Sequence, residues 1–269
     1  DNGIDHYRQD YNIEPAGFWY HNDPEGREGI TENHYVEGLY TYWDNILRHH
    51  PRGFIDNCAG GGRRLDLETL QRSAPLWRTD YRYGEPVGYQ THTFGLALWL
   101  PQTGTGLMQT DKFTTRSSLG CTVIFSWKIT EPENNLLEMR KLMDEIDELR
   151  PYYFEDYYPL TSTQHILGDS VWLAYQLNRR SANDGIVVAF RRATAPDSTC
   201  MVRLRGLDAK RTYTLTDRDS RRSFTRTGAE LAHGLQLVLP EKRSSLVLMY
   251  SANTIALPAQ TKVSKRKTN

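Results

Sequence analysis

The sequence lacks an excess of either charge, because its 33 Lys and Arg residues are balanced by 33 Asp and Glu residues. A chain with no net charge gives no electrostatic reason to expect nucleic acid or an acidic membrane surface as a partner. No apolar run reaches the length of a membrane-spanning helix, and no signal peptide is visible. We therefore expect neither a nucleic acid nor a membrane to be the partner of this protein.

Cysteine is also scarce. The chain has three, Cys58, Cys121 and Cys200, which is an odd number without metal-like spacing. A disulfide framework is therefore not expected, and we expect neither a metal nor another cofactor. The sequence begins with Asp1, only a few residues before an expected strand. We interpret it as the C-terminal part of a longer protein.

The first half of the chain alternates short apolar strands with helices, which is typical of a parallel sheet covered by helices. A turn-rich connection is expected at 15–29, and the longest helices at 31–49 and 134–150. The predicted strands are 3–10, 53–58, 75–80, 95–100 and 119–127. About five strands fall short of the eight that close a (β/α)₈ barrel. The pattern therefore predicts the C-terminal portion of such a TIM barrel, at residues 1–158.

The second half changes to short strands separated by turn signals such as Asn183-Asp184-Gly185, which is typical of antiparallel sheets. We expect an all-β antiparallel sandwich at 159–257, followed by a disordered tail at 258–269. The fold class is thus α/β, a partial barrel followed by a sandwich.

Two aspartates follow predicted strands, and they are the first candidates for chemistry. Asp10 ends the first strand and Asp80 the third, so their side chains are expected to converge at one rim of the barrel. A retaining glycosidase needs two such carboxylates, one as nucleophile and one as acid and base. The competing interpretation is that each Asp only caps the helix after it, which is the commoner role of an Asp at a strand end.

Three motifs in the expected order favour the first interpretation. Arg8-Gln9-Asp10-Tyr11-Asn12, Cys58-Ala59-Gly60-Gly61-Gly62-Arg63 and Trp77-Arg78-Thr79-Asp80 match the nucleophile, glycine-rich and acid/base motifs of one family in order and spacing. The sequence therefore resembles the melibiase group of retaining α-galactosidases, glycoside hydrolase family 36. The likeness covers residues 1–160, and the short-strand half fits that family's C-terminal sandwich.

The resemblance implies a role for each matched residue. Asp10 is the expected nucleophile, and Asp80 is the acid that later acts as base. The substrate-binding residues are then Arg8, Asn12, Cys58 and Gly61. Arg8 and Gln9 depart from the Lys and Trp of the family, and the loss of the Trp ring is expected to change how the sugar stacks. Trp77 is expected to pack behind Asp80 rather than to contact sugar.

The expected activity is hydrolysis of terminal α-galactosides, such as raffinose- or melibiose-type oligosaccharides or glycoconjugates, by double displacement. An α-N-acetylgalactosaminidase, a transglycosylase on the same scaffold and a non-catalytic sugar-binding fragment stay open as alternatives. The expected partner is a carbohydrate substrate. Assembly into a homo-oligomer stays open, and so does the possibility that this chain alone is inactive.

Overall fold

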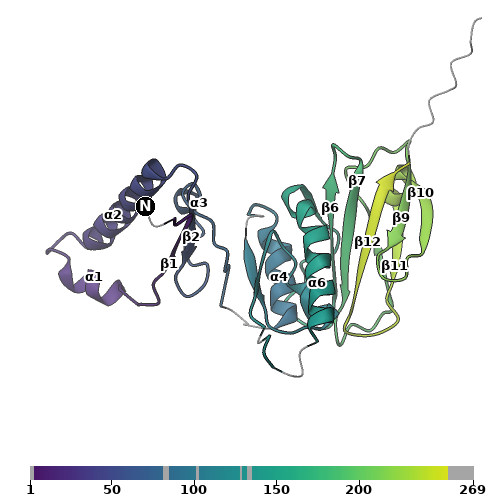
Figure 1. Ribbon diagram of the computed structural model, residues 1–269, viewed down its shortest axis with the longest axis horizontal. Helices are drawn as coiled ribbons and strands as arrows, with labels where there is room; N and C mark the ends of the chain where they lie inside the picture. The colour runs from purple at the N-terminus through teal and green to yellow at the C-terminus, as the bar shows by residue number, and fades with distance from the viewer. Residues whose placement is uncertain (1–2, 81–84, 101–102, 128, 132–134, 254–269) are drawn as a thin grey trace, which may run out of the picture.

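The architecture is that of a computed structural model, which describes residues 3–80, 85–100, 103–127, 129–131 and 135–253 (Figure 1). The described residues of the first half contain four regular parallel strands and six α-helices. They are β1 (His6–Asp10), α1 (Ala16–Asn22), α2 (Ile30–His49), β2 (Phe54–Cys58), α3 (Leu67–Leu70), α4 (Pro86–Leu96), β3 (Gly104–Leu107), α5 (Lys112–Ser117), β4 (Thr122–Phe125) and α6 (Leu136–Leu149).

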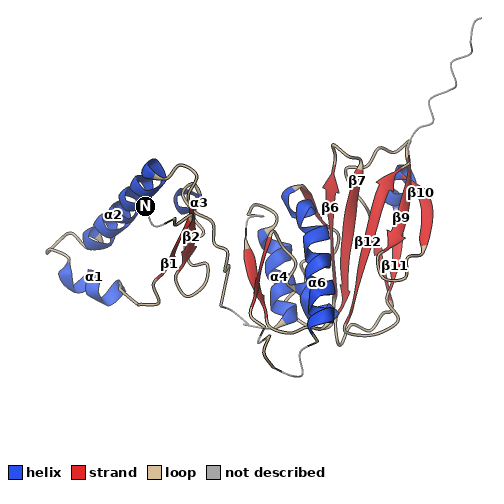
Figure 2. Ribbon diagram, viewed as in Figure 1, coloured by secondary structure: helices blue, strands red, loops and turns tan. Residues whose placement is uncertain are grey.

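The second half is mostly antiparallel sheet (Figure 2). It begins with a 3-10 turn, η1 (Arg150–Phe154), and continues with β5 (Asp156–Pro159), β6 (Trp172–Arg179), β7 (Asp184–Arg191), β8 (Thr199–Val202), β9 (Thr212–Asp217), β10 (Ser223–Thr227), α7 (Gly228–His233), β11 (Leu235–Val238) and β12 (Ser244–Ala252). A six-stranded sheet has the order β10-β9-β12-β7-β6-β5, and β11 pairs with β8 in a separate two-stranded sheet. The predicted disordered tail at 258–269 lies outside the described residues.

The parallel strands form two pairs, β1 with β2 and β3 with β4. The segment 74–78 lies between these pairs and is hydrogen-bonded to both. Ala74 N donates to Ile55 O over 3.0 Å on one side, and Arg78 N donates to Gly104 O over 3.0 Å on the other. The predicted strand at 75–80 is therefore not a regular strand, because it bends at 76–77, but the segment hydrogen-bonds to a neighbour on each side.

The expected strand at 95–100 is wrong, because this run belongs to the end of α4 and the turn after it. Glu85 starts the helix by accepting hydrogen bonds from the amides of Val87 and Gly88, and Pro86 suits the first turn. Phe94 is buried because its side of the helix packs on the core. A short apolar run cannot by itself distinguish a buried helix from a strand.

The regular strand in this part of the chain is β3, although its glycines at 104 and 106 would by themselves predict a turn. A Cβ added to Gly104 would lie 2.6 Å from both Leu76 O and Thr122 O, the carbonyls of the chains on either side. These glycines therefore allow neighbouring backbones to approach closely rather than to turn. The expected strand at 119–127 is shorter than predicted, and the connection at 15–29 contains α1.

The central strands β6 and β7 of the six-stranded sheet are buried on both faces, whereas the edge strand β10 is largely exposed. Leu173, Tyr175 and Leu177 of β6 face the core that also contains Ile146 and Leu149 of α6. Alternate residues of the sheet face a second core, which includes residues of β8, β11 and α7. The first core joins both predicted domains, and the predicted boundary at 158/159 lies within β5.

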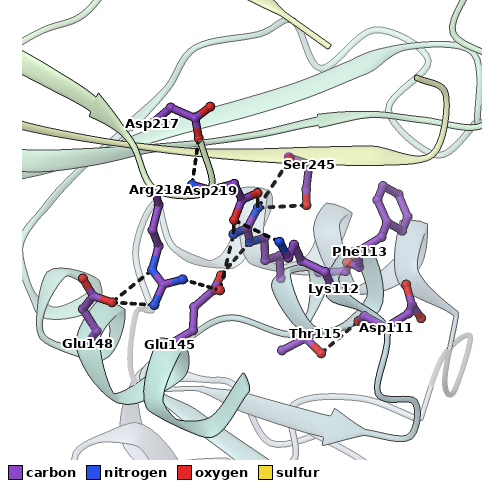
Figure 3. Close-up of polar contacts among 12 residues, drawn as sticks. Asp111, Lys112, Phe113, Thr115, Glu145, Glu148, Asp217, Arg218, Asp219 and Ser245 are labelled. Carbon is purple, nitrogen blue, oxygen red and sulfur yellow. Dashed lines mark hydrogen bonds and ion pairs between the residues drawn. The ribbon is translucent and has the colours of Figure 1, made fainter. Parts of the chain in front are cut away.

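A buried ion-pair cluster also joins the two halves (Figure 3). Arg116 of α5 has no exposed side-chain surface and forms ion pairs with Glu145 of α6 over 2.6 Å and with Asp219 over 2.7 Å. Asp219 lies in the turn between β9 and β10, and Arg218 beside it pairs with Glu145 over 2.8 Å. The cluster therefore holds α5 and α6 against a turn of the antiparallel sheet.

Candidate active site

The three motifs converge on one side of the parallel strands. Parallel pairing places Asp10 at the end of β1 directly beside Cys58 at the end of β2. The glycine-rich loop after Cys58 contacts the segment that carries Asp80. Together they form a cavity of about 270 Å³, lined by all six predicted site residues and by Trp77: Arg8, Asp10, Asn12, Cys58, Gly61, Trp77 and Asp80.

Gly61 brings the loop against the Asp80 segment and has to be glycine for two reasons. Its φ of +80° lies in the left-handed region, which side chains disfavour. A Cβ at this position would also lie 2.6 Å from Asp80 N and 2.7 Å from Thr79 Cα. The next residue, Gly62, donates its amide to Arg78 O over 2.9 Å. This loop therefore fixes where Asp80 enters the cavity.

Arg8 places a positive charge beside Asp10. Its Nη2 lies 3.2 Å from Asp10 Oδ2, and its Nη1 forms a shorter ion pair with the buried Asp56. Burial alone would lower the pKa of Arg8, but hydrogen bonding to Asp56 and then to Asp10 raises it overall. Arg8 is thus held as a cation between two carboxylates.

Asp56 is a residue that sequence reasoning missed. It lies opposite Arg8 in the β1–β2 register, and its Oδ1 also accepts a hydrogen bond from Leu76 N over 3.1 Å. Asp56 therefore connects β1, β2 and the segment leading to Asp80. The sequence does contain a clue to Asp56: it lies two residues before Cys58, and alternate residues of a strand share a face.

Trp77 does more than pack behind Asp80. Its indole Nε1 donates a hydrogen bond to Asp80 Oδ1 over 2.7 Å, and the residue lines the cavity. The ring rests on β3, where a Cβ added to Gly106 would lie 2.4 Å from Trp77 Cη2. Gly106 thus makes the space that lets the indole reach the carboxylate.

Gln9 does not line the cavity, so the expected effect of this position on sugar stacking is not supported by direct contact. It is buried on the opposite side of β1, where its Oε1 accepts a hydrogen bond of 2.8 Å from Trp43 Nε1 of α2. Residues next to each other in a strand point to opposite faces, so Arg8 and Asp10 face the cavity while Gln9 faces the helix.

Cys58 lines the cavity as a neutral thiol. Burial raises its pKa above the ordinary value, and this effect outweighs the opposing contributions of the Gly61 amide and the Arg8 charge. All three cysteines of the chain are free. Across the described ranges, no group of three or more His, Cys, Asp or Glu residues is placed to hold a metal ion. No helix in the same ranges is long and apolar enough to cross a membrane.

Known proteins with similar sequences and structures are α-galactosidases, although no family model matches the chain. The bifunctional α-galactosidase/sucrose kinase AgaSK of Mediterraneibacter gnavus is 24% identical over 212 residues, which cover 74% of this chain and 22% of that protein. Alpha-galactosidase 2 of Pediococcus pentosaceus is 25% identical over 174 residues, covering 59% and 23% respectively.

Among solved structures, a variant of the family 36 α-galactosidase AgaA from Geobacillus stearothermophilus in complex with stachyose superposes with a TM-score of 0.75. It is 21% identical, and the match covers 93% of this chain and 36% of that one. This chain therefore spans about a third of the solved structure and less than a quarter of the sequence relatives. These comparisons confirm the resemblance seen in the motifs, because the homologues and structural neighbours of this chain are α-galactosidases of glycoside hydrolase family 36. The chain corresponds to a fragment of those proteins that resembles their C-terminal part.

Proposed function

We propose that these residues form part of the catalytic apparatus of a retaining, exo-acting α-galactosidase. The observation that carries the proposal is the cavity itself. Six residues selected by motif, from three separate segments, line one space of about 270 Å³. That volume is just below the range of about 300–1,000 Å³ that is usual for ligand pockets, and it suits one sugar ring better than a chain of them.

The proposed architecture is the C-terminal portion of a (β/α)₈ barrel followed by the antiparallel sandwich. In this arrangement β1, β2, the segment 74–78, β3 and β4 are five neighbouring parallel strands. The hydrogen bonds of Ala74 to Ile55 and of Arg78 to Gly104 support the continuity of this series. Catalytic residues of such barrels lie at the carboxyl ends of strands, where Asp10 and Asp80 are found.

In the proposed mechanism, the Asp10 carboxylate attacks the anomeric carbon while Asp80 donates its proton to the departing glycosidic oxygen. The bond to the leaving group breaks as the ester to Asp10 forms. Asp80, now a carboxylate, takes a proton from water, whose oxygen displaces Asp10 and restores the original configuration. The two carboxyl groups of such enzymes lie about 5–5.5 Å apart.

The other residues of the cavity hold the sugar and the two acids. Arg8 keeps positive charge beside Asp10, which favours the ionised nucleophile. Asn12 offers an amide that can donate to or accept from sugar hydroxyls. The close packing at Gly61 holds the loop against the segment that carries Asp80, and the neutral thiol of Cys58 adds a small contact at the C-terminal end of β2.

Two complexes of AgaA support the choice of aspartates. The raffinose complex carries an Asp-to-Asn substitution and the stachyose complex an Asp-to-Ala substitution at a different position. Those two positions lie as far apart in AgaA as Asp10 and Asp80 do in this sequence. The same complexes support α-galactosyl oligosaccharides as the substrate class proposed for this protein.

Azide rescue of two matched variants tests the mechanism in the natural protein, with an aryl α-galactoside as substrate. Asp10→Asn should abolish turnover, and azide should restore it with β-galactosyl azide as the product, because azide then attacks the substrate directly. Asp80→Ala should instead yield α-galactosyl azide, because azide attacks the ester on Asp10. Undiminished turnover by Asp10→Asn, or the opposite pair of products, would refute the assignment.

The identity of the sugar is tested separately with aryl α-glycosides of galactose, N-acetylgalactosamine and glucose. We expect the galactoside to have the highest kcat/KM. Preference for N-acetylgalactosamine, or transfer to sugar acceptors in place of hydrolysis, would assign the same residues to a different reaction. Binding of galactose without turnover would indicate a non-catalytic sugar-binding protein.

A further inference from the structure

The guanidinium of Arg8 is shared between two carboxylates on neighbouring strands. Its Nη2 contacts Asp10 Oδ2 over 3.2 Å, and its Nη1 forms the shorter of the two ion pairs, with Asp56 Oδ2. Asp56 lies opposite Arg8 in the register of β1 and β2, whereas Asp10 is two residues further along β1 on the same face. One arm of the guanidinium is therefore turned toward β2 and away from Asp10.

The contact between Arg8 and Asp10 differs from the usual pairing of an arginine with a carboxylate. A planar guanidinium is suited to holding both oxygens of one carboxylate with two nitrogens. Arg179 does so elsewhere in the chain, because its Nε and Nη2 donate to the two oxygens of Asp184 over 2.9 and 2.6 Å. Arg8 contacts Asp10 through Nη2, while its Nη1 is held by Asp56.

Asp56 is itself fixed in place, so it can anchor one arm of Arg8. Its side chain is only 9% exposed, and its Oδ1 accepts the amide of Leu76 over 3.1 Å. Its backbone also forms a bridge with Ala74. Arg8 and Asp10 are 42% and 34% exposed where they line the cavity. Because a buried carboxylate needs its cation more than a hydrated one does, Asp56 holds the guanidinium more firmly than Asp10.

The division of Arg8 between two acids matters for the chemistry proposed for Asp10. In a pair with two parallel hydrogen bonds, both oxygens of Asp10 would accept from the guanidinium, and one of these strong bonds would have to break before that oxygen could attack. The hydrogen bond from Arg8 goes to Oδ2 of Asp10. A positive charge therefore stays beside the nucleophile while its other oxygen is not engaged by the guanidinium.

We propose that Asp56 is a positioning residue of the candidate site, which draws one arm of the Arg8 guanidinium away from Asp10 and so keeps one oxygen of the nucleophile free to attack. Asp56 does not line the cavity and acts through Arg8. The inference rests on the proposed function for the role of Asp10, whereas the geometry that it assigns to Arg8 can be tested without any reaction.

The kinetic test removes Asp56 in two backgrounds of the natural protein, with 4-nitrophenyl α-galactoside as substrate. Asp56→Asn keeps an oxygen for the Leu76 amide but removes the charge that holds Arg8. It should lower kcat/KM by about tenfold or more, because Arg8 then turns to both oxygens of Asp10. In an Arg8→Lys background the same substitution should cost less than about threefold, because a compact ammonium lacks the fork that takes both oxygens.

A matched control is available at a second arginine that pairs with two acids. Arg72 contacts Asp44 over 2.7 Å and Glu68 over 2.9 Å, and Asp44 does not line the cavity. Asp44→Asn should therefore leave kcat/KM within about twofold of the wild-type value. A merely structural role of Asp56 predicts an equal loss from Asp56→Asn in both backgrounds. That result, or no loss in the wild-type background, would overturn the proposal.

A crystal structure of the Asp56→Asn variant of the natural protein distinguishes failure of this inference from failure of the proposed function. We expect two nitrogens of Arg8 to contact the two oxygens of Asp10 in this variant, as Arg179 contacts Asp184. A natural protein that cleaves no aryl α-galactoside would refute the proposed function, and the crystal structure would still decide what Asp56 does to Arg8. An Arg8 that keeps its single contact with Asp10 in the variant would overturn the inference.

Discussion

Charged side chains are used differently around the candidate site and at the junction of the two halves of the molecule. In the first half, the pair of Arg63 and Glu14 is 61% and 78% exposed, and Arg8 beside Asp10 is 42% exposed. Where α5 and α6 meet the sheet, Arg116 is fully buried and pairs with Glu145 and Asp219. The buried charges pair with one another and hold α5 and α6 against the turn between β9 and β10. The exposed charges remain accessible to a ligand.

The largest effect on stability is expected for the buried Arg116. Arg116→Ala should reduce the free energy of unfolding by about 3–5 kcal/mol, because it leaves the carboxylate of Glu145 buried with less compensation. Urea unfolding of the wild-type protein and the variant measures the loss. A change below about 1 kcal/mol would show that this cluster behaves like a surface pair.

Trp77 lines the cavity of the candidate site, and its replacement should affect catalysis rather than folding. Trp77→Phe keeps the ring but removes the donor to Asp80, so we expect kcat/KM for raffinose to fall by about 10–100-fold, which is about 1.4–2.7 kcal/mol. The loss should be smaller for an activated aryl galactoside, whose leaving group needs less help from an acid.

Gly106→Ala provides the matched variant, because it reaches Asp80 only by displacing the Trp77 ring. It should show the same dependence on the leaving group as Trp77→Phe. A uniform loss with both substrates in both variants would assign Trp77 a purely structural role.

Asp219 predicts how the buried cluster responds to acid. Burial opposes ionisation of Asp219, but hydrogen bonds and charges of Arg116 and then Lys112 lower its pKa to about 2. Because this pKa is below that of the unfolded chain, about 3.9, the pairing stabilises the fold at neutral pH. That contribution is lost as the pH falls from about 4 to about 2.

The matched variant is Asp219→Asn, compared with the wild-type protein by urea unfolding at several pH values. After allowance for solvent screening of this partly exposed group, the difference should be about 1–2 kcal/mol at pH 7. It should shrink toward pH 2, where the wild-type carboxyl is itself protonated. A difference that is independent of pH would contradict the electrostatic explanation.

The smallest effect is expected at the exposed pair. Glu14→Gln should change the free energy of unfolding by less than about 1 kcal/mol, because both partners remain hydrated. Thermal unfolding of the Glu14→Gln and Arg116→Ala variants under the same conditions compares the two losses of stability directly. If Glu14→Gln lost as much stability as Arg116→Ala, the exposed and the buried ion pairs would not differ in their contribution to the fold.

Sequence reasoning found the candidate site because its residues belong to contiguous motifs. Asp10, Cys58 and Asp80 each occur within a short recognisable stretch, and parallel strands bring such stretches to one edge. The helical periodicity at 134–150 predicts an apolar stripe, of which Met139, Leu142, Ile146 and Leu149 of α6 are buried. Leu136 and Met143, which the same stripe includes, are exposed.

The remaining features depend on contacts that no local pattern encodes. Arg116 and Asp219 are 103 residues apart, and nothing near either residue indicates the other. Gly104 resembles a turn residue, and only the carbonyls on both sides of it show that it belongs to a strand. Trp77 reaches Asp80 because Gly106 leaves space on a different strand, which the motif containing Trp77 does not show.

The central claim is that the Asp10 carboxylate forms a bond to the sugar. The most direct measurement is mass spectrometry of peptides from the natural protein after reaction with 5-fluoro-α-galactosyl fluoride, whose anomeric fluoride leaves as an ester forms. We predict a fluorogalactosyl ester on the peptide that contains Asp10. A label on another carboxylate, or an active enzyme that releases fluoride without ever forming an ester, would contradict the account.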